Sequence, residues 1–328
     1  MEHRFRDDDV TLPCGVTGET IEFDSADPVN YHEVISAGAG LVARRIDGKL
    51  FVPTGTAGSI GAGASHPAVV ITPGSLGVAP SHLAHADALV RQGVAAFVID
   101  PFGARAVTST VANQTQYSFA ASAYDVLAAL RTLAARPEVD AARIGAQGHS
   151  RGGSAVVTAA MDRYAGAVVG EGLRLRAVYA AYPWCGQQFL RPSLGATTLR
   201  AIIGEHDDWC SPQQVQAHVH AMVLCGGDAT FRLVAGAGHS FDRETPVEHI
   251  AEASVSPHAP TVYLDDDGAM IHPLTGRPDA ALTDREVMRY AVKAGFGVRG
   301  ARIGSSGDQP QVFREDMLGF WRTALAEG

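Results

Sequence analysis

The sequence predicts an α/β fold with a mostly parallel sheet that helices cover on both faces. Short apolar runs rich in Val, Ile and Ala recur along the 328 residues, and helical patterns separate them. Strands that alternate with helices in this way are typical of a parallel sheet packed between two layers of helices. Because 46% of the residues are hydrophobic, the chain can bury a sizeable core. We therefore expect residues 1–328 to form a single domain.

The first half of the chain predicts strands at 20–23, 42–52, 68–71 and 94–99, and helices at 82–92 and 117–135. The pair Asp47-Gly48 predicts a turn that breaks the second of these strands. A segment rich in Gly, Ala, Ser and Thr predicts a loop at 54–65. Apolar residues recur at i, i+3 and i+4 in 117–135, which indicates an amphipathic helix.

The second half predicts strands at 143–147, 176–181, 199–204 and 230–234, and helices at 154–160, after Pro212 and at 313–325. A segment at about 244–312 is rich in Pro, Gly and Asp. Segments of this length without regular structure are uncommon in compact domains and are often functional. We predict an insertion beside the active edge of the sheet, and the sequence leaves open whether it instead forms an oligomer contact.

Composition excludes several classes of function. The net charge of −9 and the lack of a dense Lys/Arg run argue against a nucleic-acid partner. The N-terminus lacks the apolar core of a signal peptide, and no run approaches 18 apolar residues, so we expect a cytoplasmic location and no membrane partner. The four cysteines lack metal-ligand spacing and the histidines supply no three convergent ligands, so no metal and no cofactor are predicted.

The most informative motif is Gly148-His149-Ser150-Arg151-Gly152, which lies between a predicted strand and a predicted helix. A serine on so sharp a turn has a strained backbone, and the glycines remove side chains that would collide with the strand and the helix. The turn places Ser150 at a helix N-terminus, which favours a developing oxyanion. The motif predicts a nucleophilic serine, whereas a Gly/Ser turn without chemistry is the alternative.

A serine nucleophile needs a base and an acid, which follow in the order Ser, Asp or Glu, His in this strand-turn-helix arrangement. One predicted strand ends in Glu205-His206-Asp207-Asp208, and the next ends in Gly238-His239-Ser240. The carboxyl ends of parallel strands meet at one edge of a sheet, so these side chains are expected to converge. We predict that His239 is the base and that Asp207, rather than Asp208, is the acid.

From these motifs, the chain resembles the dienelactone hydrolase family of α/β-hydrolases over about residues 68–243. The most specific matches are the turn at 148–153 and the run at 238–241. The resemblance implies an α/β-hydrolase fold and a small-molecule ester or lactone as substrate. The family's usual nucleophile is a cysteine, where this chain has Ser150, and Gly74 takes the place of a glutamate that helps to govern that cysteine. A serine has no thiolate to regulate, so both departures fit a serine mechanism.

The resemblance also implies two arginines that hold a substrate carboxylate. Arg105 and Arg243 are their counterparts, and a guanidinium pair clamps a carboxylate through charge-assisted hydrogen bonds. The alternative is that each arginine pairs with a local carboxylate, as Arg243 could with Asp242 or Glu244. Arg151 is a third candidate, for which a solvent-exposed or ion-paired side chain is the alternative.

Together the residues predict a serine hydrolase that cleaves a carboxylic ester or lactone through an acyl-enzyme. Ser150 attacks, His239 accepts its proton, and Asp207 orients His239. The backbone N–H groups of Ser75 and Arg151 are expected to stabilise the oxyanion. Two alternatives remain: an acyltransferase that uses the same triad, and a non-catalytic binding protein on a hydrolase scaffold.

Overall fold

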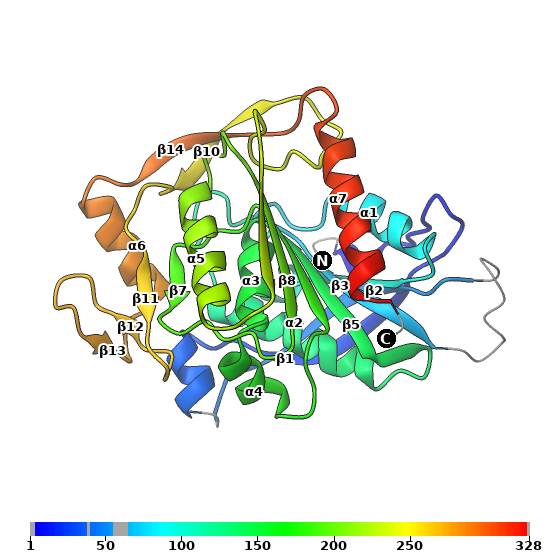
Figure 1. The fold of residues 1–328 in the computed structure, drawn as a ribbon, viewed down its shortest axis with the longest axis horizontal. Coiled ribbons are helices and arrows are strands. Elements are labelled where there is room, and N and C mark those ends of the chain that lie inside the picture. The colour runs from blue at the N-terminus through cyan, green and yellow to red at the C-terminus, as the bar shows by residue number, and fades with distance from the viewer. Residues whose placement is uncertain (1–3, 38–39, 55–64, 327–328) are drawn as a thin grey trace.

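The computed structural model describes residues 4–37, 40–54 and 65–326, and its centre is an eight-stranded sheet (Figure 1). The strands are β1 (Glu19–Ala26), β2 (Ala43–Phe51), β3 (His66–Thr72), β4 (Ala95–Asp100), β5 (Val139–His149), β6 (Ala177–Ala181), β8 (Thr198–Gly204) and β9 (Ala229–Val234). They are ordered β1-β2-β4-β3-β5-β6-β8-β9 across the sheet. β2 pairs antiparallel with β1 and with β4, and the six strands from β4 to β9 run parallel.

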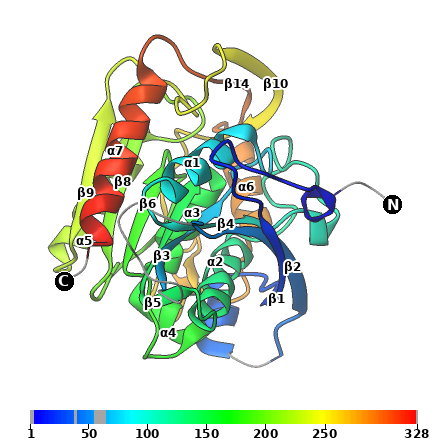
Figure 2. The ribbon, with the colours of Figure 1, turned by 90° about the vertical axis from the view of Figure 1, so that its right-hand side faces the viewer.

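Seven α-helices accompany the strands in the described part of the chain: α1 (Pro80–Val90), α2 (Phe119–Ala134), α3 (Arg151–Ala159), α4 (Asp162–Val169), α5 (Pro212–Leu224), α6 (Asp284–Lys293) and α7 (Gln309–Ala324). Helices α1 and α7 lie on one side of the sheet and α2 on the other (Figure 2). On the α7 side, the indole N–H of Trp321 donates to the amide oxygen of Gln147 at 2.9 Å. Every residue of β4 and β6 is buried, as expected for parallel strands covered on both faces.

The structure confirms the predicted α/β class, and most predicted strands and helices lie within two or three residues of the observed ones. The turn predicted at Asp47-Gly48 is wrong, because both residues lie inside β2. Gly48 is needed there for close packing: a Cβ at this position would lie 2.6 Å from the carbonyl oxygen of Val98 on β4. The loop predicted at 54–65 falls on residues 55–64, which lie outside the described residues.

The segment that precedes α7 contains short strands and one helix. Its strands are β10 (Glu248–Val255), β11 (Val262–Leu264), β12 (Met270–Ile271), β13 (Pro278–Asp279) and β14 (Val298–Ile303). β10 pairs antiparallel with β14, and β11 runs parallel to β7 (Gln187–Phe189), which follows β6 in the chain. The segment thus docks on the main body through a strand pair as well as through α6. The described ranges also contain three short helical turns: Phe5–Asp7, Glu33–Ala37 and Gly103–Arg105.

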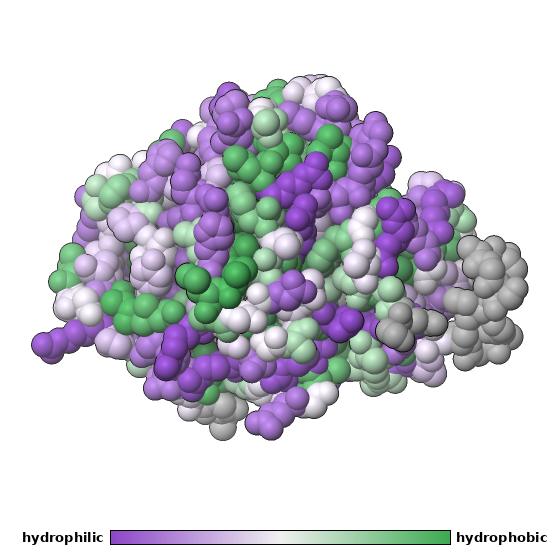
Figure 3. All heavy atoms as spheres, in the orientation of Figure 1, coloured by the Kyte–Doolittle hydropathy of each residue, from purple (hydrophilic) through white to green (hydrophobic). Residues whose placement is uncertain are grey.

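The outer surface mixes polar and apolar residues. Apolar patches on the face in Figure 3 are small and are separated by hydrophilic residues. None of the helices in the described ranges has the length and apolar character needed to cross a bilayer.

Burial of His218 in α5 generates a test of stability. Neither of its two buried ring nitrogens has a hydrogen-bond partner among the described residues, and burial lowers its pKa from 6.5 to about 4. The unfolded chain therefore binds a proton at His218 below about pH 6.5, whereas the folded chain binds it only below about pH 4. Because the unfolded chain binds more protons between these pH values, the free energy of unfolding falls as the pH falls through that window.

We expect His218→Leu to stabilise the protein by about 1–3 kcal/mol, because it removes two unsatisfied polar groups. The gain should grow by roughly 2 kcal/mol between pH 8 and pH 5. Thermal or urea unfolding at both pH values checks this, with His220→Leu as the control, because His220 is exposed on the same helix. A loss of stability in His218→Leu, or an equal gain at both pH values, would contradict the account.

Candidate active site

A sharp turn carries Ser150. β5 ends at His149, and α3 begins at Arg151. Ser150 has φ 55° and ψ −116°, a costly backbone conformation for a residue with a side chain. Its N–H donates to the carbonyl oxygen of Ala181 at 2.9 Å, which holds the turn against β6. The hydroxyl of Ser150 therefore lies at the carboxyl edge of the parallel strands, where open α/β sheets gather their ligands.

The two glycines that flank Ser150 are required by close backbone contacts. A Cβ at Gly148 would overlap the carbonyl group of Gly152, and a Cβ at Gly152 would overlap the carbonyl oxygens of Thr72 and Pro73. Both positions thus need glycine for β5, α3 and the end of β3 to approach so closely. This is the packing reason expected from the sequence.

His239 connects Ser150 to Asp207. Its Nε2 lies 2.9 Å from Oγ of Ser150, and its Nδ1 lies 2.7 Å from Oδ2 of Asp207. The other oxygen of Asp207 accepts hydrogen bonds from the N–H groups of Trp209 and Cys210, both at 2.9 Å. These contacts hold the carboxylate in place, so it can fix the ring orientation and tautomer of His239.

Asp208 faces away from this chain of hydrogen bonds. Its carboxylate accepts from the backbone N–H of Arg302 at 3.1 Å and from the guanidinium at 3.0 Å. The structure therefore brings Asp207, and not Asp208, into contact with His239.

Aromatic rings enclose the imidazole of His239. The Trp209 ring stacks on it with a centroid distance of 5.3 Å, and the Tyr182 ring meets it edge-on at 4.7 Å. Only 3% of His239 is exposed. The ring is thus held in one plane and is shielded from water on both sides.

Two backbone N–H groups are free beside Ser150. Among the described residues, none accepts a hydrogen bond from the N–H of Ser75 or of Arg151, and both residues share the wall of one cavity with Ser150. Ser75 is anchored because its carbonyl oxygen accepts from the N–H of Thr110 at 2.8 Å and its hydroxyl donates to Gln114 at 3.0 Å. Free, fixed N–H groups of this kind can stabilise an oxyanion.

The side chain of Arg151 is not exposed, and no carboxylate in the described ranges forms an ion pair with it. It is buried and donates hydrogen bonds to the carbonyl oxygens of Gln114, Tyr117 and Ser118 at 2.6–3.1 Å. Its guanidinium lies 4.2 Å from the ring centroids of Tyr117 and of Phe119. Arg151 therefore ties the loop before α2 to the turn of Ser150.

Arg105 lies in an ion-pair network away from Ser150. Its guanidinium contacts the carboxylates of Asp27 and Asp125, each at 2.7 Å, and its side chain is 4% exposed. Neither cavity beside Ser150 includes Arg105 in its wall. These contacts correspond to the alternative in which the arginine pairs with local carboxylates, so Arg105 is not available to a substrate at Ser150.

Arg243 differs from Arg105. It is half-buried and lines a cavity with Ser150 and His239. No described carboxylate forms an ion pair with its guanidinium: Asp242 contacts His85, and Glu244 contacts Arg314. A cation without a counter-ion in a cavity can bind an anionic group of a ligand.

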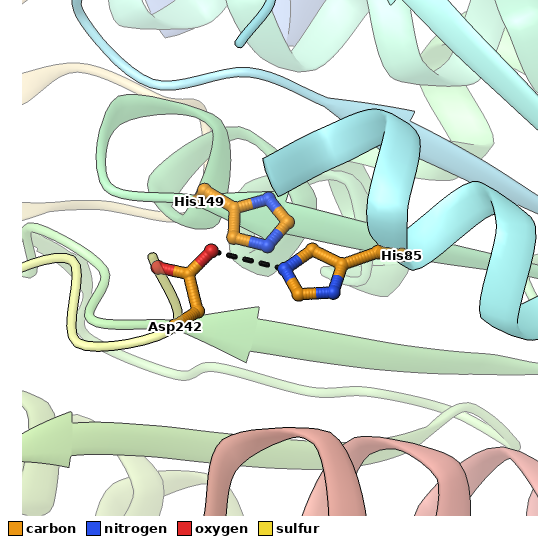
Figure 4. A group of neighbouring side chains, drawn as sticks. All are labelled: His85, His149 and Asp242. Atoms are coloured by element: carbon orange, nitrogen blue, oxygen red, sulfur yellow. Dashed lines mark hydrogen bonds and ion pairs between the residues drawn. The ribbon is translucent and has the colours of Figure 1, made fainter. Parts of the chain in front are cut away.

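Asp242 belongs to a buried cluster with His85 and His149 (Figure 4). Nε2 of His85 donates to Oδ2 of Asp242 at 2.9 Å, and the hydroxyl of Tyr182 donates to Oδ1 at 2.6 Å. Burial opposes ionisation of Asp242, yet the hydrogen bonds from His85 and Tyr182 hold the pKa of its carboxyl well below its usual range. Because Tyr182 packs on His239, the cluster braces the loop that carries His239.

His149 completes this cluster without a direct bond to Asp242. Its ring stacks on that of His85 with planes 4° apart, and burial lowers its pKa well below 6.5, so it is neutral. One ligand atom from each of His85, His149 and Asp242 would lie within 4.8 Å of the others. Imidazole lone pairs lie in the ring plane, however, so two parallel stacked rings do not converge on one metal ion. We interpret the cluster as structural.

Two small cavities meet at Ser150, and Ser75 and Trp209 line both of them. The apolar cavity, about 30 Å³, is walled mainly by Phe119, Trp184, Trp209, Val255 and Met288. The second cavity, about 20 Å³, is the more polar of the two and is called the polar cavity below: its wall includes Ser81, His82, His239, Ser240 and Arg243 beside Leu76, Tyr182 and Ile303. Sequence patterns did not identify Val255 or Met288, because they lie in a segment that carries no motif.

Comparison with known proteins identifies the family of the chain. The model of the dienelactone hydrolase family matches residues 56–259, which is more than half of the chain. No curated protein sequence matches. The solved structure named m3DLH is 19% identical with a TM-score of 0.51, and the match covers 85% of this chain and 97% of that one.

Two further solved structures show lower similarity. A dienelactone hydrolase-like promiscuous phosphotriesterase, P91, from metagenomic libraries is 18% identical with a TM-score of 0.46, covering 69% of this chain and 85% of its own. A thermophilic esterase, Est2, from Thermogutta terrifontis is 15% identical with a TM-score of 0.44, covering 66% and 84%. At such identities these structures concern the fold alone. The match of the family model decides the family: this chain belongs to the dienelactone hydrolase family of hydrolases.

Proposed function

We propose that this hydrolase cleaves a carboxylic ester or lactone with Ser150 as the nucleophile. The observation that carries the proposal is the chain of contacts from Oγ of Ser150 through His239 to Asp207, at 2.9 Å and 2.7 Å. A serine hydroxyl in contact with an imidazole that a carboxylate orients is the arrangement that activates serine for acyl transfer.

The proposed reaction has two halves. Oγ of Ser150 attacks the carbonyl carbon while Nε2 of His239 takes the hydroxyl proton, and the N–H groups of Ser75 and Arg151 stabilise the oxyanion. The bond to the alcohol oxygen then breaks, and His239 gives its proton to that oxygen. Water next attacks the acyl group and gives a proton to His239, which returns it to Ser150 as the carboxylic acid leaves.

The position of His239 indicates on which side the alcohol leaves. The leaving oxygen must come within reach of Nε2 to receive its proton. His239 lines the polar cavity and is not part of the wall of the apolar one. We therefore propose that the leaving group occupies the polar cavity, where Arg243 favours one that bears a carboxylate.

The first prediction is that Ser150→Ala and His239→Ala each lower kcat/KM for an ester by about 10³-fold or more, because the three residues act as a unit. Hydrolysis of p-nitrophenyl acetate gives the rates, and circular dichroism checks that each variant is folded. Turnover close to that of the wild type in either variant would refute the mechanism.

The second prediction concerns the two aspartates. Asp207→Asn should reduce kcat by roughly 10²-fold to 10⁴-fold, because an amide no longer stabilises the charged imidazole or fixes its tautomer. Asp208→Asn serves as the matched control and should stay within about threefold of the wild type, since the carboxylate of Asp208 bonds to Arg302 and not to His239. If Asp208→Asn is the more damaging change, the assignment of the acid is wrong.

The third prediction concerns Arg243. Acetoxyacetate and acetoxyacetamide share an acyl group and differ in the charge of the leaving group. Arg243→Ala should lower kcat/KM for the anionic ester by the equivalent of about 1.5–3 kcal/mol, which is the scale of a charge-assisted hydrogen bond. It should leave kcat/KM for the neutral ester nearly unchanged. Arg314→Ala, which removes a half-exposed arginine paired with Glu244, is the control. An equal loss for both esters would show that Arg243 has a structural role only.

A further inference from the structure

The segment before α7 supplies one wall of the apolar cavity. Ser254, Val255 and Ser256, at the end of β10, and Met288 of α6 line it opposite Phe119 and Trp184. The family match ends at residue 259, so Met288 lies in a part of the chain that the match does not reach. Met288 thus adds to a wall whose other part, residues 254–256, lies inside the matched region.

Several buried contacts fix this wall to the body of the protein. The carboxylate of Asp284, at the start of α6, accepts from the N–H of Phe119 and from the side-chain amide of Gln187, each at 2.7 Å. The N–H of Ser254 donates to the carbonyl oxygen of Val111 at 2.9 Å. Because Asp284 binds α6 to the start of α2, which carries Phe119, the two sides of the cavity are fixed relative to one another.

The position of this cavity indicates which part of a substrate it receives. The leaving group belongs on the His239 side, so the acyl chain must extend into the cavity on the other side of Ser150. There it meets mostly apolar surface and a small cavity of about 30 Å³. Only a short acyl chain fits such a space without displacement of its walls.

We propose that the wall formed by β10 and α6 restricts the enzyme to esters with short, unbranched, apolar acyl groups, and that Met288 determines the accepted length. This inference rests on the proposed serine mechanism. Met288 is half-buried, and its sulfur accepts a hydrogen bond from the hydroxyl of Ser256, with 3.8 Å between sulfur and oxygen. Its side chain is the part of the wall that α6 contributes, so its size sets the depth of the cavity.

The test is a series of p-nitrophenyl esters from acetate to octanoate, which share one leaving group. For the wild type, kcat/KM should fall by about 10-fold or more between acetate and hexanoate, which is the scale of discrimination by an apolar pocket against one extra methylene group. Met288→Ala should raise the hexanoate to acetate ratio by about 10-fold. Met288→Phe should lower the hexanoate to acetate ratio, and it should lower the propionate to acetate ratio by about 10-fold.

Val292→Ala is the matched control, because Val292 lies one turn further along α6 and is 54% exposed, so its ratios should equal those of the wild type. A wild type that prefers hexanoate to acetate, or ratios that stay constant in both Met288 variants, would overturn the proposal. Ser150→Ala, measured on the same esters, separates the two claims. If it abolishes hydrolysis while the Met288 ratios do not move, the serine mechanism stands and the length restriction fails.

Discussion

The site depends on the backbone contact at the turn between β5 and α3. Gly148 and Gly152 let the turn close against the end of β3, and this closure holds Ser150 in a conformation that costs free energy on its own. The same turn frees the N–H of Arg151 at the start of α3 and aims the hydroxyl of Ser150 at His239. A side chain at either glycine would move all of these groups together.

The sequence was sufficient to predict the sheet and the three residues that meet at its edge. Ser150, Asp207 and His239 each follow a strand, and parallel strands bring their carboxyl ends together, so order along the chain predicts proximity. It left open whether Arg105 holds a substrate or pairs with a carboxylate, and it did not identify Asp27 and Asp125 as the partners, because they come from distant elements. The prediction of a turn at Asp47-Gly48 was wrong for a related reason. Glycine is needed at position 48 for close packing on β4 and not for a change of chain direction.

The segment before α7 illustrates what a sequence without a motif cannot convey. Nothing in the composition of 244–312 indicates that Val255 and Met288 face Ser150. Their position follows from the pairing of β10 with β14 and from the buried carboxylate of Asp284, which binds the start of α2. The fold brings the turn, His239 and Asp207 together, and the segment before α7 shapes the space beside them.

The central claim is that Ser150 carries the acyl group. The most direct measurement is intact-protein and peptide mass spectrometry after reaction with a fluorophosphonate, which forms a stable bond to an activated serine. The account predicts a single adduct on Ser150 in the wild type, strongly slowed labelling in His239→Ala, and none in Ser150→Ala. An adduct on another residue, such as Cys210 in the same cavity, or equal labelling of the wild type and His239→Ala, would contradict it.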